Sequence, residues 1–248
     1  MSYLLNPYIF QGFLSNSLLV LDAGNTSSYS GSGTTWYDLS GRGNNATMSN
    51  CTYGGSGTGA YLIFNGTNST ANVPQSSDFN ISSKDFTITM WCYGDSAMGT
   101  STVYHSVSEI SVPSNDNFYH GIWRSGLYPG ADYSVMGGAA LFQTAVTGGG
   151  GAGYLGNASS TYSYLNKWTN VVFTRSGVNA SMYLNGSLWA TRTFTSPTNV
   201  SNYVYIGGNN DGNRSWWGNI SLYAIHDIAM TGTEILNYYN LYKSRYGL

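Results

Sequence analysis

Apolar and polar residues alternate most regularly over residues 86–93, and a period of two is typical of a β-strand. One face of this stretch carries Phe86, Ile88, Met90 and Cys92. The opposite face carries Thr87, Thr89, Trp91 and Tyr93. Because both faces hold large side chains, we expect a central strand that is covered on both sides.

The strongest hairpin signal lies in the second half of the chain. Extended patterns cover residues 168–175, 180–184 and 187–194, and the dipeptide Asn185-Gly186 separates the last two. Asn-Gly supplies the two positive φ angles of a type I′ turn, so it predicts a tight hairpin there.

Shorter apolar runs predict further buried strands. They cover residues 17–22, 60–64, 69–73, 102–107, 118–124, 139–146, 203–207 and 216–226. Asn65-Gly66 predicts a second hairpin between the strands at 60–64 and 69–73. Residues 23–50 are rich in Gly, Ser, Thr and Asn, which predicts a long ordered loop with one short extended piece at 35–39.

The two ends of the chain carry different signals. Thr231 and Glu234 have the spacing of a capping box, which predicts a helix over residues 234–245 that ends near Gly247. Residues 1–16 are expected to form an N-terminal arm, separate from a single domain at 17–248. The apolar side chains expected to anchor this arm in an assembly are Tyr3, Leu4, Leu5, Tyr8, Ile9 and Phe10.

Composition narrows the function classes. Only 8% of residues are charged, against roughly a quarter in a typical domain, while 42% are hydrophobic and Gly occurs 32 times. These values favour an all-β domain with many turns. The nine Lys and Arg residues form no run, so we expect no nucleic-acid partner. No apolar stretch approaches the ~20 residues of a membrane span, and the N-terminus carries no export signal, so we expect no membrane insertion.

Several motifs, taken in chain order, resemble the concanavalin A-like, laminin G-like jelly-roll superfamily. They lie at residues 18–25, 33–45, 64–66, 86–91, 168–175, 182–186, 206–208 and 217–220. The resemblance implies an antiparallel jelly-roll sandwich of two sheets with a short C-terminal helix. The ending, residues 230–247, resembles the variant found in phage and other virion proteins.

Catalytic residues are sparse. A glycosidase needs two carboxyl groups, and Glu109, one of only two glutamates with Glu234, has no acid two or four residues further on. We therefore expect no enzyme activity, with a divergent glycoside hydrolase acting through Glu109 as a remote alternative. No cofactor is required. The resemblance adds calcium as an optional ligand, with Asp22, Asp38 and Asn44 as candidate residues. In the alternative interpretation, Asp38 and Asn44 brace their loop by accepting backbone N–H groups.

Glycan binding needs an exposed aromatic ring beside amide and carboxylate groups. Two segments, residues 117–123 and 209–217, have that composition. The candidate residues are Asn210, Asp211, Asn213, Arg214, Trp216 and Trp123. By contrast, Trp36, Trp91, Trp168 and Trp217 fall on the family's core motifs, so we expect them to be packed in the interior.

Taken together, these patterns favour a non-catalytic structural protein at a virion surface, either a capsid decoration or a tail-appendage component. Its expected partners are other virion proteins, copies of itself and surface glycans. A soluble extracellular lectin or adhesin is the alternative from another class.

Overall fold

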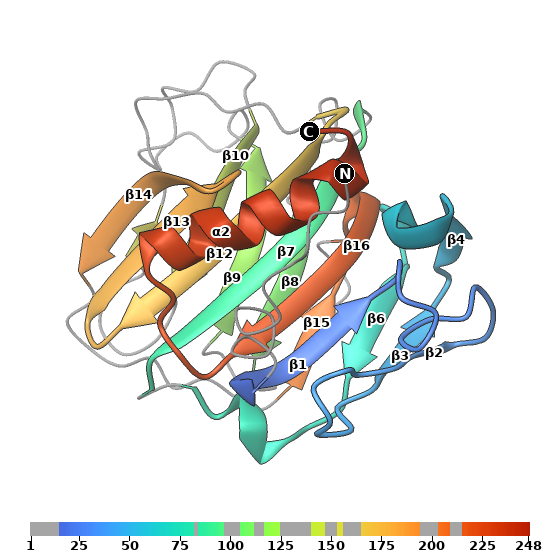
Figure 1. The fold of residues 1–248 in the computed structure, drawn as a ribbon, viewed down its shortest axis with the longest axis horizontal. Helices are drawn as coiled ribbons and strands as arrows, with labels where there is room; N and C mark the ends of the chain where they lie inside the picture. The colour runs from blue at the N-terminus through green and yellow to red at the C-terminus, as the bar shows by residue number, and fades with distance from the viewer. Residues whose placement is uncertain are drawn as a thin grey trace, which may run out of the picture.

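In the computed structural model, the strands form two antiparallel sheets that pack face to face (Figure 1). The structure describes residues 15–81, 84–96, 105–111, 117–124, 140–146, 153–155, 165–193, 203–208 and 215–248, with backbone alone for 105, 111, 192 and the three segments between 117 and 155. The predicted two-sheet sandwich is confirmed. The predicted arm residues from Tyr3 to Phe10 lie outside the described residues.

The first sheet has the strand order β14-β13-β12-β7-β16-β5-β4, and β1 pairs with β16 beside β5. Its strands are β1 (Ser17–Asp22), β4 (Thr52–Gly54), β5 (Tyr61–Asn65), β7 (Phe86–Gly94), β12 (Trp168–Ser176), β13 (Asn179–Leu184), β14 (Ser187–Thr193) and β16 (Trp217–His226). Strand β7 lies between β12 and β16, so the predicted central strand is confirmed.

The second sheet has the strand order β11-β10-β9-β8-β15-β6-β3-β2. Its strands are β2 (Thr35–Trp36), β3 (Ala46–Ser49), β6 (Thr70–Val73), β8 (His105–Ser111), β9 (Asn117–Arg124), β10 (Ala140–Val146), β11 (Gly153–Leu155) and β15 (Tyr203–Ile206). Two short 3-10 helices, η1 (Gly57–Gly59) and η2 (Ser77–Phe79), lie in the connections.

The core fills the space between the inner faces of the two sheets. Phe86, Ile88 and Met90 of β7 belong to one buried cluster with Val204 and Ile206 of β15. Burial of each such side chain stabilises the fold by about 1.5–3 kcal/mol. The period-two pattern therefore fixes which residues of each strand face the opposite sheet.

A helix covers part of the outer face of the first sheet, and Figure 1 shows it running across β7 and β12. Helix α2 (Gly232–Tyr242) packs Ile235 and Tyr238 into a second buried cluster with Trp91 and Leu222. The predicted capping box is present, with the Thr231 hydroxyl accepting from the N–H of Glu234. The helix continues as the 3-10 helix η4 (Lys243–Tyr246), which ends at Gly247 in the left-handed conformation.

Only one of the two predicted Asn-Gly hairpins forms. Asn185 and Gly186 adopt φ of 50° and 77°, and β13 pairs with β14 across them as predicted. The second prediction was wrong, because β5 belongs to the first sheet and β6 to the second. Asn65 does not adopt a positive φ, and its Oδ1 instead accepts N–H groups of Thr67 and Asn68, which turns the chain from one sheet to the other.

The prediction of a loop over residues 23–50 was wrong in part. Strand β3 lies within this segment and pairs with β2 and β6. Strand β4, which follows the segment and was also not predicted, pairs with β5. Both strands are short and carry few large apolar residues, so their period is weak. Among the described residues, no helix has the length and apolar character needed to cross a membrane.

Candidate functional site

The Asp38 carboxylate holds its own loop together. Its Oδ1 accepts the N–H groups of Val20 and Ser40, each at 2.9 Å. Its Oδ2 accepts the N–H of Asn44 at 3.0 Å and the hydroxyl of Ser40 at 2.6 Å. Asp38 therefore makes the hydrogen bonds expected of a residue that braces its loop, which was the alternative to calcium binding.

Asn44 lies next to Asp38, but its side chain is turned toward a different acid. Its buried amide group donates to the carbonyl of Leu18 at 2.9 Å and to Oδ2 of Asp78 at 2.8 Å. In the described part of the chain, no group of three or more His, Cys, Asp or Glu residues could hold a metal ion. Calcium binding by Asp22, Asp38 and Asn44 therefore stays a prediction.

The third candidate metal ligand, Asp22, forms a two-pronged ion pair with Arg245. The Asp22 Oδ1 and Oδ2 atoms accept from Arg245 at 2.7 and 2.9 Å. Burial lowers the pKa of Arg245, but the hydrogen bonds to Asp22 and the charges of Asp22, Tyr242 and Tyr246 together outweigh that effect, and the net shift is upward. The pair joins the end of β1 to η4, so Asp22 already has a cationic partner.

At the start of β16, the prediction that Trp216 is exposed and Trp217 is packed in the interior was wrong for both residues. Trp216 is 0% exposed and belongs to the core, whereas Trp217 is 40% exposed. Neighbouring strand residues point to opposite faces, so one of the two had to be buried. The predicted residues Asn210, Asp211, Asn213 and Arg214 lie outside the described residues, and for Trp123 in β9 the backbone alone is described.

Two tyrosines form an aromatic platform on the outer face of the second sheet. Tyr203 and Tyr205 alternate along β15 with Val204 and Ile206, which are fully buried in the core. The tyrosine rings therefore lie on the face turned away from the core. Their centroids are 6.3 Å apart and their planes differ by 22°. Both side chains are half-buried, as a fixed but accessible platform requires.

Polar groups flank this platform on both sides. The register places Asn72 of β6 and Glu109 of β8 opposite Tyr205. The Tyr203 hydroxyl lies 3.3 Å from Oε1 of Gln75. The buried Oδ1 of Asn72 has no hydrogen-bond partner among the described residues. We call these five residues, Asn72, Gln75, Glu109, Tyr203 and Tyr205, the tyrosine face.

Glu109 is the acidic residue of the tyrosine face. Its side chain is fully buried although its strand position is on the outer side. Burial raises the pKa of Tyr205, and the charge of Glu109 raises it further. The described side chains of β2, β3, β6, β8 and β15 include no Lys or Arg. An uncharged ligand therefore fits this face better than an anion does.

The strand neighbours of Glu109 bear on the enzyme alternative. Its lateral partners in the register are Tyr205 and position 119, also a tyrosine. The residues two positions away along β8 are Val107 and Ser111. None of these four residues carries a carboxyl group, although retaining glycosidases place two about 5–5.5 Å apart. In these described surroundings, Glu109 borders an aromatic platform.

Comparisons with known proteins identify the fold. A family model described as the concanavalin A-like lectin/glucanases superfamily matches residues 65–236. No curated protein sequence matches the chain.

Solved structures of binding domains are similar in shape. The ligand-binding domain of botulinum neurotoxin serotype D, in complex with N-acetylneuraminic acid, is 15% identical with a TM-score of 0.66, over 94% of this chain and 52% of that one. The binding domain of Paraclostridial mosquitocidal protein 1 is 14% identical with a TM-score of 0.67, over 93% and 53%. Trypanosoma rangeli sialidase bound to the inhibitor DANA is 14% identical with a TM-score of 0.60, over 90% and 32%. The chain thus spans about half of each of the two binding domains and a third of the sialidase.

Proposed function

Since the chain belongs to the concanavalin A-like lectin/glucanase superfamily, we propose that it is a non-catalytic glycan-binding domain whose tyrosine face contacts the sugar. The observation that carries the proposal is the pair of nearly parallel rings of Tyr203 and Tyr205, flanked by amides and a carboxylate. Aromatic rings stack on the apolar face of a sugar, and amide and carboxylate groups bind its hydroxyls.

The chemistry of the tyrosine face selects among sugars. Glu109 lies fully buried beside Tyr205, so its carboxylate disfavours an anionic ligand through its charge and not through direct contact. Asn72 adds a half-buried side-chain amide beside Tyr205 that can bind a sugar hydroxyl. We therefore propose neutral sugars as the ligands, in contrast to the N-acetylneuraminic acid bound by the similar toxin domain.

A glycan array followed by calorimetry on the intact chain tests the proposal. We expect binding of at least one neutral sugar, and we expect the double variant Tyr203→Ala/Tyr205→Ala to lose that binding. Tyr37→Ala is the matched control, because it removes a tyrosine ring that is 52% exposed at a different place. Unchanged affinity in the double variant would contradict the proposed site, and a blank array would contradict the function.

We propose further that this domain is carried on a virion surface, which the low charge and the resemblance of residues 230–247 support. Asn16, where the arm joins β1, accepts the N–H of Asp227 through its carbonyl. Deletion of residues 2–14 keeps that contact and is expected to abolish incorporation into particles while leaving the fold intact. Normal incorporation of the shortened chain would contradict this assignment.

A further inference from the structure

A second row of aromatic side chains crosses the outer face of the first sheet, beyond the part covered by α2 and η4. The register places Trp168, Tyr93, Asn219 and Ile63 opposite one another across β12, β7, β16 and β5. Tyr61 and Trp217 extend the row, because each lies two residues from a member on its own strand. We call these six residues the outer strip.

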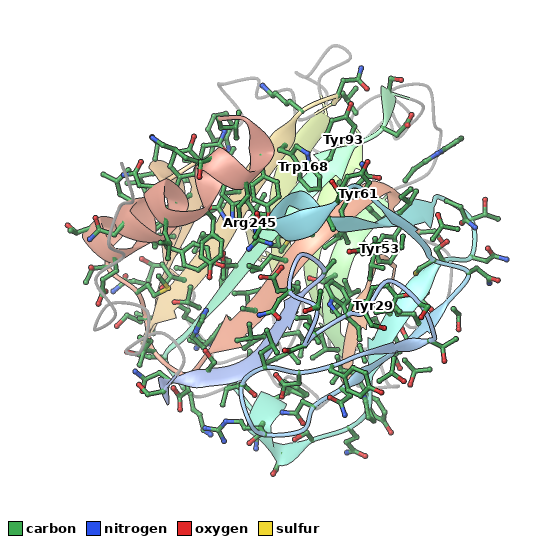
Figure 2. All side chains as sticks on the ribbon, turned by 45° about the vertical axis from the view of Figure 1, so that its right-hand side comes forward. Tyr29, Tyr53, Tyr61, Tyr93, Trp168 and Arg245 are labelled. Carbon is green, nitrogen blue, oxygen red and sulfur yellow. The ribbon has the colours of Figure 1, made fainter. Side chains whose placement is uncertain are left out.

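The ring of Trp168 contacts two other rings of the outer strip. The centroid of Trp168 lies 5.8 Å from that of Tyr93 and 5.5 Å from that of Tyr61. Figure 2 shows these three side chains gathered together, with Arg245 further along the same face. Tyr246 of η4 packs on Trp168 at 4.8 Å and marks the border with the covered part of the sheet. The strip therefore continues the aromatic layer beneath the helix, beyond the part of the sheet that α2 and η4 cover.

Trp217 is held in place and yet accessible. A Cβ at position 66 would lie 2.7 Å from its Cδ2 atom, so the indole packs directly over the backbone of Gly66. The backbone carbonyl of Trp217 accepts the N–H of Asp95. The side chain is nevertheless 40% exposed, and Ile63 beside it is 36% exposed. A ring that is already fixed loses little conformational entropy when a ligand stacks on it.

The polar atoms of the outer strip are available to a ligand. Within the described residues, the side chains of Tyr61, Tyr93, Asn219 and Trp217 make no hydrogen bond to other protein groups, although Tyr61, Tyr93 and Asn219 are only partly exposed. None of the six side chains is charged, and the charge of Arg245 is paired with Asp22. A ligand that matches this strip has apolar faces, many hydroxyl groups and no charge.

We propose that the outer strip is a second glycan site that binds a neutral oligosaccharide lying across the strands. Four strands spaced by about 4.8 Å give the strip a width of about 14 Å, which suits several linked sugar rings better than one. Trp217 is the stacking platform, and Asn219 with the tyrosine hydroxyls supplies hydrogen bonds. The inference shares its ligand class with the proposed function but depends on different residues.

Calorimetry with linear neutral tetrasaccharides of glucose, mannose and galactose tests the inference. We expect the unmodified chain to bind two molecules of one of these sugars. Trp217→Ala should remove one of the two sites, with at least a tenfold loss of affinity there. Tyr203→Ala/Tyr205→Ala should remove the other, and the control Tyr37→Ala should remove neither. Trp217→Phe keeps a ring and should retain part of the affinity. The indole N–H signal of Trp217 in NMR spectra, assigned by its loss in this variant, should shift on titration.

The outcomes separate the two proposals. If Trp217→Ala binds sugar like the unmodified chain, the outer strip is not a glycan site, and the tyrosine face is unaffected. If binding depends on Trp217 and not on the two tyrosines, the outer strip stands and the tyrosine face does not. If none of the tetrasaccharides binds and the indole signal does not shift, the outer strip proposal is overturned, and the array on the tyrosine face decides the proposed function separately.

Discussion

At the scale of single residues, Asp38 shows how one carboxylate can order a glycine-rich loop. Its two oxygens accept four hydrogen bonds from three residues. Hydrogen bonds to a charged acceptor contribute more than neutral ones, so we expect Asp38→Ala to lower the free energy of unfolding by about 2–3 kcal/mol. Urea unfolding measures this change.

Thermal unfolding with and without calcium distinguishes a structural role of Asp38 from calcium binding. If Asp38 acts as a brace, the unmodified chain should have the same Tm in calcium and in a chelator, because protein groups already occupy its oxygens. Stabilisation by calcium that Asp38→Ala abolishes would show instead that the carboxylate is a metal ligand.

The ion pair between Asp22 and Arg245 is expected to contribute more to the free energy of unfolding than the more exposed pair between Arg42 and Asp78. Both of its side chains are about seven-eighths buried, with 13% and 12% exposed. Removing one partner leaves a buried charge, so Arg245→Met should cost about 3 kcal/mol in urea unfolding. Arg42→Met is the matched control, since the Arg42–Asp78 pair is 38% and 24% exposed and should contribute about 1 kcal/mol or less. Equal losses in the two variants would contradict this ranking.

The two tryptophans at the start of β16 show a limit of prediction at this scale. The alternation of strand residues requires that one of Trp216 and Trp217 be buried. The sequence does not reveal which, because the residues before them are rich in Gly, Asn and Asp and show no period of apolar positions. Which tryptophan is exposed depends on the neighbouring strand β5, because Gly66 directly after that strand leaves room for the Trp217 ring.

At the scale of elements, α2 depends on its first turn. Thr231 and Glu234 each satisfy a backbone N–H of the other. Loss of such a cap costs about 1 kcal/mol, so Thr231→Ala should lower the Tm measurably. Thr233→Ala provides the control, because this exposed threonine follows two residues later without a role in the box. A similar decrease in both variants would show that helix propensity, rather than the cap, is responsible.

The strands and the two Asn-Gly dipeptides show what local sequence can and cannot specify. The Asn185-Gly186 hairpin was predictable because strong strands flank it and pair with each other. At Asn65-Gly66 the local signal is the same, but the flanking strands do not pair with each other. Strand β5 pairs with β16 in the first sheet, and β6 pairs with β15 in the second. Strands β3 and β4 could not be predicted, since their pairing depends on distant partners rather than on their own pattern.

At the scale of the whole molecule, buried thiol and tyrosine groups that must stay protonated limit the stability of the folded chain at high pH. Burial raises the pKa of Cys51 from 9.0 to about 12 and that of Tyr242 from 10.0 to about 12. The unfolded chain therefore releases protons at lower pH than the folded one. Stability is fully present below about pH 9 and is lost as the pH rises toward 12.

Thermal unfolding at a series of pH values measures this loss. Cys51→Ala removes one of the groups and should reduce the decline, and an unchanged profile in that variant would contradict the role of the thiol. The part of the tyrosinate absorbance that belongs to Tyr223, Tyr238 and Tyr246 should appear together with unfolding, because burial raises the pKa of each of these three residues.

The tyrosine face could not be predicted from the sequence, because its residues come from three distant segments. Asn72, Glu109 and Tyr205 lie on β6, β8 and β15, and the register alone brings them together. From the sequence, Glu109 is only a remote catalytic candidate, and the candidate sugar contacts lie in two other segments, residues 117–123 and 209–217. A strand with two half-buried tyrosines at alternate positions was the one available signal.

The pairing of β1 with β16 has a consequence for the synthesis of the protein. Figure 1 shows the two strands side by side, and the register joins Leu21 to Tyr223, about 200 residues later. The first sheet therefore cannot be completed until β16, which ends at His226, has left the ribosome. Contacts of such long range also slow folding, because a large loop must close before they form. Nascent chains of this protein should hold β1 unpaired until β16 emerges, and chaperones that bind apolar segments have that interval in which to act.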